Sequence, residues 1–281
     1  MTRAQKSNLT GWGFIAPACL LFILFSLIPL IKGISLSMYR ADVFGSEFVG
    51  LANFKEMFES RLFWKGFRHT LVFTGITVPI FTSIPLFVSI LAARTTRAFQ
   101  YYIRFAFYIP EIAAGVVIVA VWKWIFHPTN GILNYILGKD IAWFGQNPFA
   151  MTAIEIMLVT SGFGMAVMFF MARLLSIDKE IYDAAKIDGA KWYHEIRYIT
   201  LPLIMPMIAF IVITRTIGYL QTWEYPYMMS GGGPNNGTTT MALQMYQNGV
   251  LLGRWGYAAA IGMFLLLITL TLAIIQRRIF R

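Results

Sequence analysis

The sequence predicts an all-α integral membrane protein with six transmembrane helices, and two properties of the chain support this class. Hydrophobic residues make up 58% of the 281 positions and charged residues 13%, whereas a soluble domain usually carries about 25% charged residues. A surface so poor in charge cannot face water everywhere, so much of it must face lipid. Six apolar runs also reach the length that a helix needs to cross a bilayer, about 20 residues. They are 12–35, 70–93, 105–125, 150–172, 203–223 and 257–276.

The first run, 12–35, is predicted to be a retained membrane span. Its apolar stretch is longer than the core of a signal peptide, and no small-residue cleavage site follows it. Cys19, the single cysteine, lies inside this run, so no disulfide within the chain and no cysteine-based metal site is expected. Prolines within later runs, such as Pro79, Pro85 and Pro206, indicate a packed bundle, because neighbouring helices must satisfy the carbonyls that proline frees.

Lysine and arginine residues between the apolar runs predict that both termini lie in the cytoplasm. With six spans, the termini share one side with the loops 94–104 and 173–200, and this side carries thirteen basic residues. The opposite side carries nine, and six of these lie in the long segment 32–68, where charge has less influence on orientation. The positive-inside rule therefore assigns the thirteen to the cytoplasm. The net charge of +10 reflects this clustering, and no basic stripe on a polar domain indicates a nucleic-acid partner.

The segment between the fourth and fifth runs predicts a cytoplasmic helix–turn–helix that lies parallel to the membrane. Residues 178–187 are expected to form a short helix with acidic residues in its first turn, and Gly189 ends it. A second short helix, about 191–199, carries apolar residues on one side. Pro202 then begins the next span, where its missing N–H costs nothing. The two helices are half apolar and too small to form a core, so this segment needs a partner surface.

The motif within 176–202 is specific. The sequence has Asp183-Ala184-Ala185, then Gly189 after three residues, Ile199 after nine more, and Leu201-Pro202 after one. This spacing resembles the EAA loop of importer-type ABC transporter permeases, although Asp183 stands where that family usually has glutamate. The resemblance implies that the loop docks into a groove of a cytoplasmic ATPase subunit. The residues that it implies for coupling are Asp183, Ala184, Ala185, Asp188, Gly189, Ile199 and Pro202.

Further stretches resemble carbohydrate-uptake permeases of the maltose and glycerol-3-phosphate type. They are 49–54, 122–126 with Gly131 and Asn134, and 232–234 with 238–240. The resemblance implies the type I ABC importer permease fold, with one transmembrane domain over 1–281 that contains the coupling loop. It implies four kinds of partner: a second, homologous permease subunit, two cytoplasmic ATPase subunits, an extracytoplasmic solute-binding protein, and membrane lipid. The implied location is the cytoplasmic membrane of a prokaryote, crossed several times.

The same resemblance implies import of a sugar, an oligosaccharide or a sugar-phosphate-like solute by alternating access. No cofactor is expected on this chain, and ATP and Mg²⁺ are assigned to the partner ATPase, because the glycine run 231–233 lacks the Lys-Ser/Thr of a phosphate-binding loop. The chain is therefore expected not to be an enzyme and to have no catalytic residues. No metal site is expected, since His69, His127 and His194 lack metal-ligand spacing. The alternative function is an ion-gradient-driven secondary transporter, which needs no coupling loop.

Charged residues at membrane depth are costly, and they point to function. Glu155 lies in the fourth run and Arg215 in the fifth, and Glu111 follows Pro110 near the start of the third. One interpretation pairs Glu155 with Arg215 as a structural ion pair. The other places Arg215 at the wall of a solute cavity, which allows an anionic solute without requiring one.

Helical spacing favours the cavity interpretation. Arg215, Tyr219 and Thr222 are at positions i, i+4 and i+7, so they share one helix face, and three residues of the fourth run also share a face. In the resembled family, the helices that flank the EAA loop line the substrate cavity. The residues expected at the cavity wall are Ser161, Gly162, Met165, Arg215, Tyr219 and Thr222. Tyr219 is expected to stack on a sugar ring, Ser161 and Thr222 to hydrogen-bond hydroxyls, and Gly162 to leave room for the solute. For Tyr219 and Met165, bundle packing is the alternative role.

Overall fold

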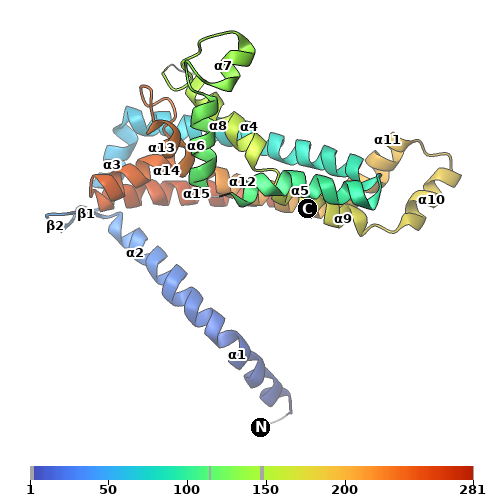
Figure 1. Ribbon diagram of the computed structural model, residues 1–281. Helices are drawn as coiled ribbons and strands as arrows, with labels where there is room; N and C mark the ends of the chain where they lie inside the picture. Colours follow the sequence, from blue (N-terminus) through green and yellow to red (C-terminus); the bar gives the residue numbers. More distant parts are fainter. Residues whose placement is uncertain (1–2, 114, 146–148, 281) are drawn as a thin grey trace. The chain divides into compact units, whose positions relative to one another are not determined.

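The computed structural model describes residues 3–113, 115–145 and 149–280, and most of these residues are helical (Figure 1). The chain divides into two compact units. Unit 1 comprises Met1–Ser60 and Met245–Phe264, and unit 2 comprises Arg61–Gln244 and Leu265–Arg281. Two helices, α14 (Met241–Tyr246) and α15 (Trp255–Ile279), contribute residues to both units.

Unit 1 begins with a long apolar helix. It consists of α1 (Arg3–Phe22), the π-helical turn η1 (Ile23–Leu27) and α2 (Ile28–Leu36). The segment Trp12–Leu36 is long and apolar enough to cross a membrane, and its most apolar stretch has no buried residue. A continuous apolar surface of this size is unusual on a soluble monomer and is suited to contact with lipid or another subunit.

A β-hairpin and a short helix follow in unit 1. The strands β1 (Tyr39–Asp42) and β2 (Gly45–Phe48) pair in antiparallel fashion, and α3 (Ala52–Glu59) comes after them. The side chain of Asn53 is buried and donates hydrogen bonds to the carbonyls of Ser37 and Tyr39 at 2.8 and 2.9 Å. Asn53 thereby anchors α3 to the hairpin. Unit 1 also contains the π-helical turn η3 (Gln247–Leu251), which precedes α15.

Unit 2 is a helical bundle. Its main helices are α4 (Arg61–Ala93), α5 (Arg97–Ile112), α9 (Gly164–Leu175) and α12 (Leu201–Leu220). α4 packs along both α9 and α12, and α5 packs on α9. Large apolar side chains from these helices, such as Phe73, Phe81 and Met171, are fully buried in the core between them. Burial of this kind holds the helices at fixed positions around the site described below.

The described helices account for the six expected spans and confirm the all-α membrane class. Four segments are long and apolar enough to cross a membrane by themselves: Trp12–Leu36, Arg61–Ala93, Trp192–Leu220 and Trp255–Ile279. The third and fourth expected spans each correspond to a bent pair of helices. α5 meets α6 (Gly115–Ile125) at 94°, and α8 (Phe149–Ser161) meets α9 at 41°, so the number of spans is six when each bent pair counts as one.

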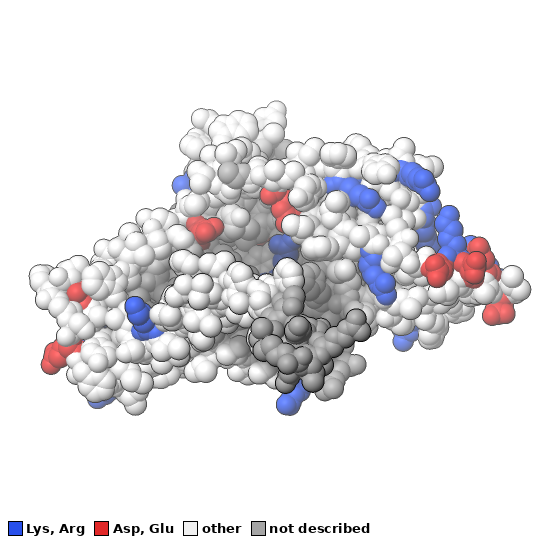
Figure 2. Space-filling model, turned by 90° about the horizontal axis from the view of Figure 1, so that it is seen from below, with Lys and Arg blue, Asp and Glu red and all other residues white. Residues whose placement is uncertain are grey.

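The remaining elements of unit 2 lie at opposite ends of the bundle (Figure 1). At one end are α10 (Lys179–Ile187), α11 (Trp192–His194) and the π-helical turn η2 (Glu195–Thr200). Toward the other end are α7 (Ile132–Leu137) and α13 (Glu224–Ser230). Figure 2 shows lysine and arginine side chains gathered over the α10–α11 end, with aspartate and glutamate at its tip.

Candidate functional site

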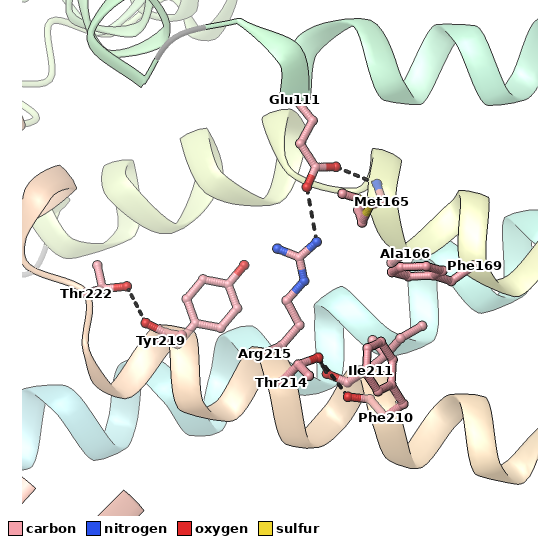
Figure 3. A pocket seen from close by; sticks show the side chains of 11 residues that line it. Glu111, Met165, Ala166, Phe169, Phe210, Ile211, Thr214, Arg215, Tyr219 and Thr222 are labelled. Atoms are coloured by element: carbon pink, nitrogen blue, oxygen red, sulfur yellow. Dashed lines mark hydrogen bonds and ion pairs between the residues drawn. The ribbon is translucent and has the colours of Figure 1, made fainter. Parts of the chain in front are cut away.

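A pocket of about 410 Å³ lies between α9 and α12, next to the end of α5 (Figure 3). Its wall combines two charged side chains and two threonines with aromatic and small residues. The lining residues are Glu111, Met165, Ala166, Phe169, Phe210, Ile211, Thr214, Arg215, Gly218, Tyr219 and Thr222. A concave site with a few polar groups among aromatic side chains can bind a small organic molecule.

Arg215 occupies the centre of this site and is held by three groups. Its Nη2 atom lies 3.2 Å from Oε1 of Glu111 and donates a hydrogen bond of 3.3 Å to the carbonyl of Gly162. The guanidinium carbon also lies 5.4 Å from the centre of the Phe81 ring, in cation–π range. Figure 3 shows Glu111 and Arg215 pointing toward each other from α5 and α12. The cost of an arginine at membrane depth is therefore offset within this chain.

Glu111 performs a second role with its other oxygen. Oε2 accepts a hydrogen bond of 2.5 Å from the backbone N–H of Met165, in the first turn of α9. The first N–H groups of a helix lack partners within the helix, and the helix dipole favours negative charge there. A single carboxylate thus joins α5 to both α9 and α12.

The break between α8 and α9 brings the start of α9 close to α5. A Cβ atom on Gly164 would lie 2.6 Å from both the Phe107 carbonyl oxygen and the Tyr108 Cα, closer than real Cβ atoms come. Glycine at this position therefore allows the contact that places the Met165 N–H beside Glu111. The bend in the fourth span lies at the short sequence Gly162-Phe163-Gly164, between α8 and α9.

The structure does not support a pair between Arg215 and Glu155. Arg215 pairs with Glu111 instead, and within the described ranges Glu155 makes no ion pair. Glu155 lies on α8, on the N-terminal side of the break between α8 and α9. Arg215 instead contacts Glu111, at the place where α5 meets the start of α9. The interpretation that placed Arg215 at a cavity wall agrees with its position in the pocket.

The six predicted cavity residues are divided between two pockets. Met165, Arg215, Tyr219 and Thr222 line the larger pocket. Arg215 and Tyr219 share a face of α12 as expected, but Thr222 lies beyond the end of this helix at Leu220. Ser161 and Gly162 line a neighbouring pocket of about 140 Å³, which Arg215 and Tyr219 also border. The prediction that Ser161, Gly162 and Met165 share one helix face is wrong, because α8 ends at Ser161 and α9 begins at Gly164.

Two further details differ from the expected roles. A Cβ on Gly162 would lie 2.8 Å from the Phe81 ring, so this glycine makes room for Phe81 and not for an empty space. Tyr219 is only 7% exposed, and its ring packs against Phe73 and Phe81, with ring centres 5.8 and 5.1 Å apart. Its face is therefore not open for stacking in this conformation. Thr222 donates its hydroxyl to the Gly218 carbonyl at 3.2 Å.

Two exposed phenylalanines supply the aromatic surface of the larger pocket. Phe169 on α9 and Phe210 on α12 are 36% and 49% exposed, and they meet edge to face with ring centres 5.7 Å apart. Sequence reasoning did not single them out. Phe169 follows Met165 by four residues, so the helical spacing that selected Met165 contained a signal for it.

The segment from α10 to η2 forms the second candidate site. Gly189 follows α10 with a φ of +78°, a left-handed conformation that ends the helix as expected. The second helix differs from the prediction. It begins at Trp192 and continues through η2 into α12 as one helix to Leu220, so Pro202 lies inside a helix and does not start one. The wider π-helical turn just before Pro202 provides the irregular hydrogen bonding that a proline in a helix requires.

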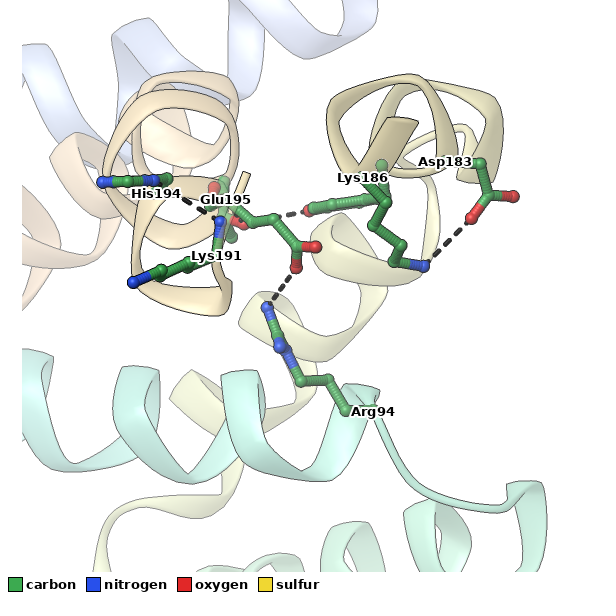
Figure 4. A network of polar contacts seen from close by, with 8 residues as sticks. Arg94, Asp183, Lys186, Lys191, His194 and Glu195 are labelled. Atoms are coloured by element: carbon green, nitrogen blue, oxygen red, sulfur yellow. Dashed lines mark hydrogen bonds and ion pairs between the residues drawn. The ribbon is translucent and has the colours of Figure 1, made fainter. Parts of the chain in front are cut away.

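One polar contact attaches this segment to the bundle, and a second joins its two parts (Figure 4). The Glu195 carboxylate is buried and lies 2.9 Å from Nη2 of Arg94, at the end of α4. The hydroxyls of Tyr182 and Thr200 lie 3.0 Å apart, which links α10 to η2. The sequence analysis did not identify these residues, because the partners are 101 and 18 positions apart in the chain.

The predicted coupling residues lie mainly on the surface of this segment. Asp183, Ala184, Asp188, Gly189 and Pro202 are exposed, and Ala185 and Ile199 are half-buried. Large apolar side chains are exposed beside them: Ile187, Trp192 and Tyr198 have 88%, 64% and 68% of their surface accessible. An exposed apolar surface of this kind marks an interaction site.

A helical bundle with several candidate membrane spans and a pocket between its helices is an arrangement suited to a membrane transport protein. Residues 51–281 match the family described as "Binding-protein-dependent transport system inner membrane component", and the chain belongs to that family. It is thus a permease component located in the inner membrane and not itself an enzyme. This finding confirms the class that the spacing from Asp183 to Pro202 indicated.

Individual relatives and solved structures extend over nearly the whole chain. The sulfoquinovosyl glycerol transport system permease protein SmoG of Agrobacterium fabrum is 31% identical over 95% of this chain and 89% of that protein. The lactose transport system permease protein LacF of Rhizobium radiobacter is 28% identical over 96% of this chain and 93% of that protein. A bacterial ABC transporter involved in the import of the acidic polysaccharide alginate matches with a TM-score of 0.86, covering 100% of this chain and 99% of the other, at 21% identity. This last likeness confirms the type I importer permease fold.

Proposed function

We propose that this chain is one of two membrane-spanning subunits of an ATP-driven importer for a carbohydrate or carbohydrate-like solute. The observation that carries the proposal is the pocket between α9 and α12, which combines Arg215, Thr214 and Thr222 with the rings of Phe169 and Phe210. Hydroxyl-rich solutes accept and donate hydrogen bonds at such polar groups, and their C–H faces pack on aromatic rings. Relatives of this chain are named for transport of lactose, arabinooligosaccharides and sn-glycerol-3-phosphate, which supports the same solute class.

The partner subunits are inferred from the two exposed surfaces. The surface around Ile187 and Trp192 is suited to the groove of a cytoplasmic ATPase subunit, and two such subunits would bind ATP and Mg²⁺. The unburied stretch within Trp12–Leu36 would face lipid or a second, homologous permease. An extracytoplasmic solute-binding protein would deliver the solute. A solved structure of similar fold contains a pentasaccharide-bound periplasmic protein, which supports this arrangement.

In this mechanism the import cycle is one of alternating access. Closure of the ATPase dimer would move the α10–η2 segment, and α12 would carry that movement to the pocket, because η2 and α12 belong to one helix. The whole of residues 1–281 would act as a single permease domain, with 176–202 as its coupling loop. Both termini would lie in the cytoplasm, on the side of the α10–α11 end where basic side chains gather.

Reconstitution tests the function directly. The chain would be purified with its partner permease and ATPase subunits, placed in liposomes, and supplied with the binding protein and labelled saccharides. We expect accumulation that requires ATP and the binding protein. Accumulation driven by a proton or sodium gradient without ATP would contradict the proposal and support a secondary transporter.

Cysteine labelling tests the orientation. Lys191→Cys and Asn236→Cys, each in a Cys19→Ala background, should react with an impermeant reagent from opposite sides of the membrane. We expect Asn236→Cys to react in intact cells, with any outer membrane permeabilised. Reaction of Lys191→Cys under the same conditions would overturn the proposed topology.

A further inference from the structure

The charged groups of the pocket cancel each other. Among the described residues that line it, the charged ones are Glu111 and Arg215, and they form an ion pair at 3.2 Å. Their side chains are 22% and 26% exposed, so a solute in the pocket can reach them. A solute therefore meets a paired carboxylate and guanidinium and not a free cation.

This pair is held firmly by several elements. Glu111 is fixed by the Met165 N–H of α9, and Arg215 by the Gly162 carbonyl and the Phe81 ring. Neither side chain can turn away without losing a second contact. The pair is thus a built feature of the pocket and differs from the exposed pair between Glu56 and Arg254, whose side chains are 51% and 43% exposed.

We propose that Glu111 determines the charge selectivity of this pocket, so that it accepts neutral, polyhydroxylated solutes and rejects anionic ones. The inference rests on the import function proposed above. An anionic group that displaced Glu111 from Arg215 would leave the Glu111 carboxylate without its cation at membrane depth. An anionic group that left the pair intact would be repelled by the Glu111 carboxylate. The names of the relatives include both lactose and sn-glycerol-3-phosphate, so they leave the charge of the solute open.

A neutral solute needs no such displacement. The hydrogen bonds of Arg215 to Glu111 and to the Gly162 carbonyl both use Nη2, and a guanidinium has five N–H donors, so donors remain for a hydroxyl oxygen. A carboxylate has about four lone-pair sites, and those left on Glu111 can accept a hydroxyl proton. A single hydroxyl could therefore donate to Glu111 while it accepts from Arg215. Phe169 and Phe210 lie on the same wall to pack against the C–H face of a sugar ring.

The test is competition at the cytoplasmic face of the reconstituted transporter, which reaches the pocket without selection by the binding protein. The probes are galactose and galacturonate, which differ by a carboxylate in place of one hydroxymethyl group. Each is added on the ATPase side, and the concentration that halves the import of a labelled neutral saccharide is measured. For the wild-type chain we expect galactose to inhibit at a concentration at least about tenfold lower than galacturonate, a difference of about 1.4 kcal/mol.

Glu111→Gln keeps the shape of the side chain and an oxygen for the Met165 N–H, but it removes the charge that cancels Arg215. We expect the ratio of the two inhibitory concentrations to shift toward galacturonate by about tenfold. Glu56→Gln removes a charge from the exposed pair and is the matched control; it should leave the ratio unchanged.

The outcomes separate this inference from the import function. A wild-type transporter that galacturonate inhibits as well as galactose overturns the inference, whatever the variant does. A ratio that Glu111→Gln leaves unchanged, or an absence of inhibition by either sugar, also overturns it. In all three cases, continued ATP-dependent import of the neutral saccharide would leave the proposed function intact.

Discussion

The pocket around Arg215 and the segment from α10 to η2 use polar residues in different ways. In the pocket, each charged group finds its partner across helices: Arg215 reaches Glu111 on α5, and Glu111 reaches the first turn of α9. On α10, the exposed Asp183 pairs with Lys186, one turn away on the same helix. The apolar side chain of Ile187 is 88% exposed beside them.

This difference indicates which region makes its polar contacts within the chain and which leaves a surface for contacts with another protein. The pocket is completed within the chain, so its geometry is set before a solute arrives. The α10–η2 segment is tied to the bundle by Glu195 and Arg94 but leaves its outer surface free for another protein. Substitutions in the two regions should therefore fail in different assays, one in solute selection and the other in subunit docking.

The largest effect is expected at Gly189. No described atom lies within 4 Å of a Cβ built at this position, so Gly189→Trp adds bulk only to the outer surface. We expect transport to fall by about a hundredfold or more, through a loss of roughly 3 kcal/mol in docking of the ATPase. Copurification of the ATPase with the permease measures the docking.

Gly189→Ala is the matched control, because it introduces the same backbone strain at a φ of +78° without the bulk. That strain costs about 1–2 kcal/mol. If Gly189→Trp retains full transport, the coupling role of this segment is wrong. If Gly189→Ala is as defective as Gly189→Trp, backbone strain and not contact with a partner is the cause.

A smaller loss of transport is expected for Arg215→Gln. Hydrogen bonds to a charged group are worth about 1.5–3 kcal/mol, so import should fall by about tenfold to a hundredfold. Import by the reconstituted transporter is the measurement, and size-exclusion chromatography reports assembly.

The double variant Glu111→Gln with Arg215→Gln separates two explanations for Arg215→Gln. If Arg215→Gln fails to assemble because Glu111 is left unpaired, the double variant should assemble, and import should still be reduced. Wild-type import by Arg215→Gln would show that this arginine does not contact the solute.

A stability effect is expected at Gly164, where α9 approaches α5. A Cβ at this position would lie 2.6 Å from the backbone of Phe107 and Tyr108, so Gly164→Ala must push the two helices apart. We expect a loss of about 1–3 kcal/mol in unfolding free energy, measured by denaturation in detergent. Gly75→Ala is the control, since nothing lies within 4 Å of its added Cβ and alanine favours a helix. Equal stability of the two variants would contradict the close packing of α9 on α5.

The smallest effect is expected for Glu195→Gln. Its partner Arg94 is 42% exposed, and solvent screening limits such a pair to about 0.5–1 kcal/mol. We expect faster hydrogen exchange in α10 and η2 by a few-fold, without loss of assembly. Asp183→Asn removes a pair whose side chains are 67% and 59% exposed, and it should leave exchange unchanged. A larger change for Asp183→Asn than for Glu195→Gln would reverse the comparison.

The spans and the coupling segment could be predicted because their signals are local. Hydropathy marks each apolar run, and the spacing from Asp183 to Pro202 lies within one stretch of chain. The shared face of Arg215 and Tyr219 on α12 follows from the helical period alone. The family and the class of fold were predictable from these features.

The partners of the pocket residues could not be predicted in the same way. Glu111 and Arg215 are 104 positions apart, and their pairing depends on the contact between α5 and α9 that Gly164 allows. The fourth span is also broken between α8 and α9, which separates Ser161 from Met165. Tyr219 was expected to face a solute, but Phe73 and Phe81 cover its ring. Such outcomes depend on tertiary packing, which a helical period does not contain.

The continuous helix from Trp192 to Leu220 has a mechanical consequence. It has 29 residues and is therefore about 43 Å long. Because the chain does not pause between η2 and α12, the helix can act as a lever with the α10–η2 segment at one end and Arg215 near the other. A tilt of about 10° around its midpoint would displace the two ends by about 4 Å in opposite directions. Arg215 lies about 13 Å from that midpoint, so the same tilt would move it by about 2 Å. Added to the present 3.2 Å between Arg215 and Glu111, a shift of that size away from α5 is enough to separate the pair.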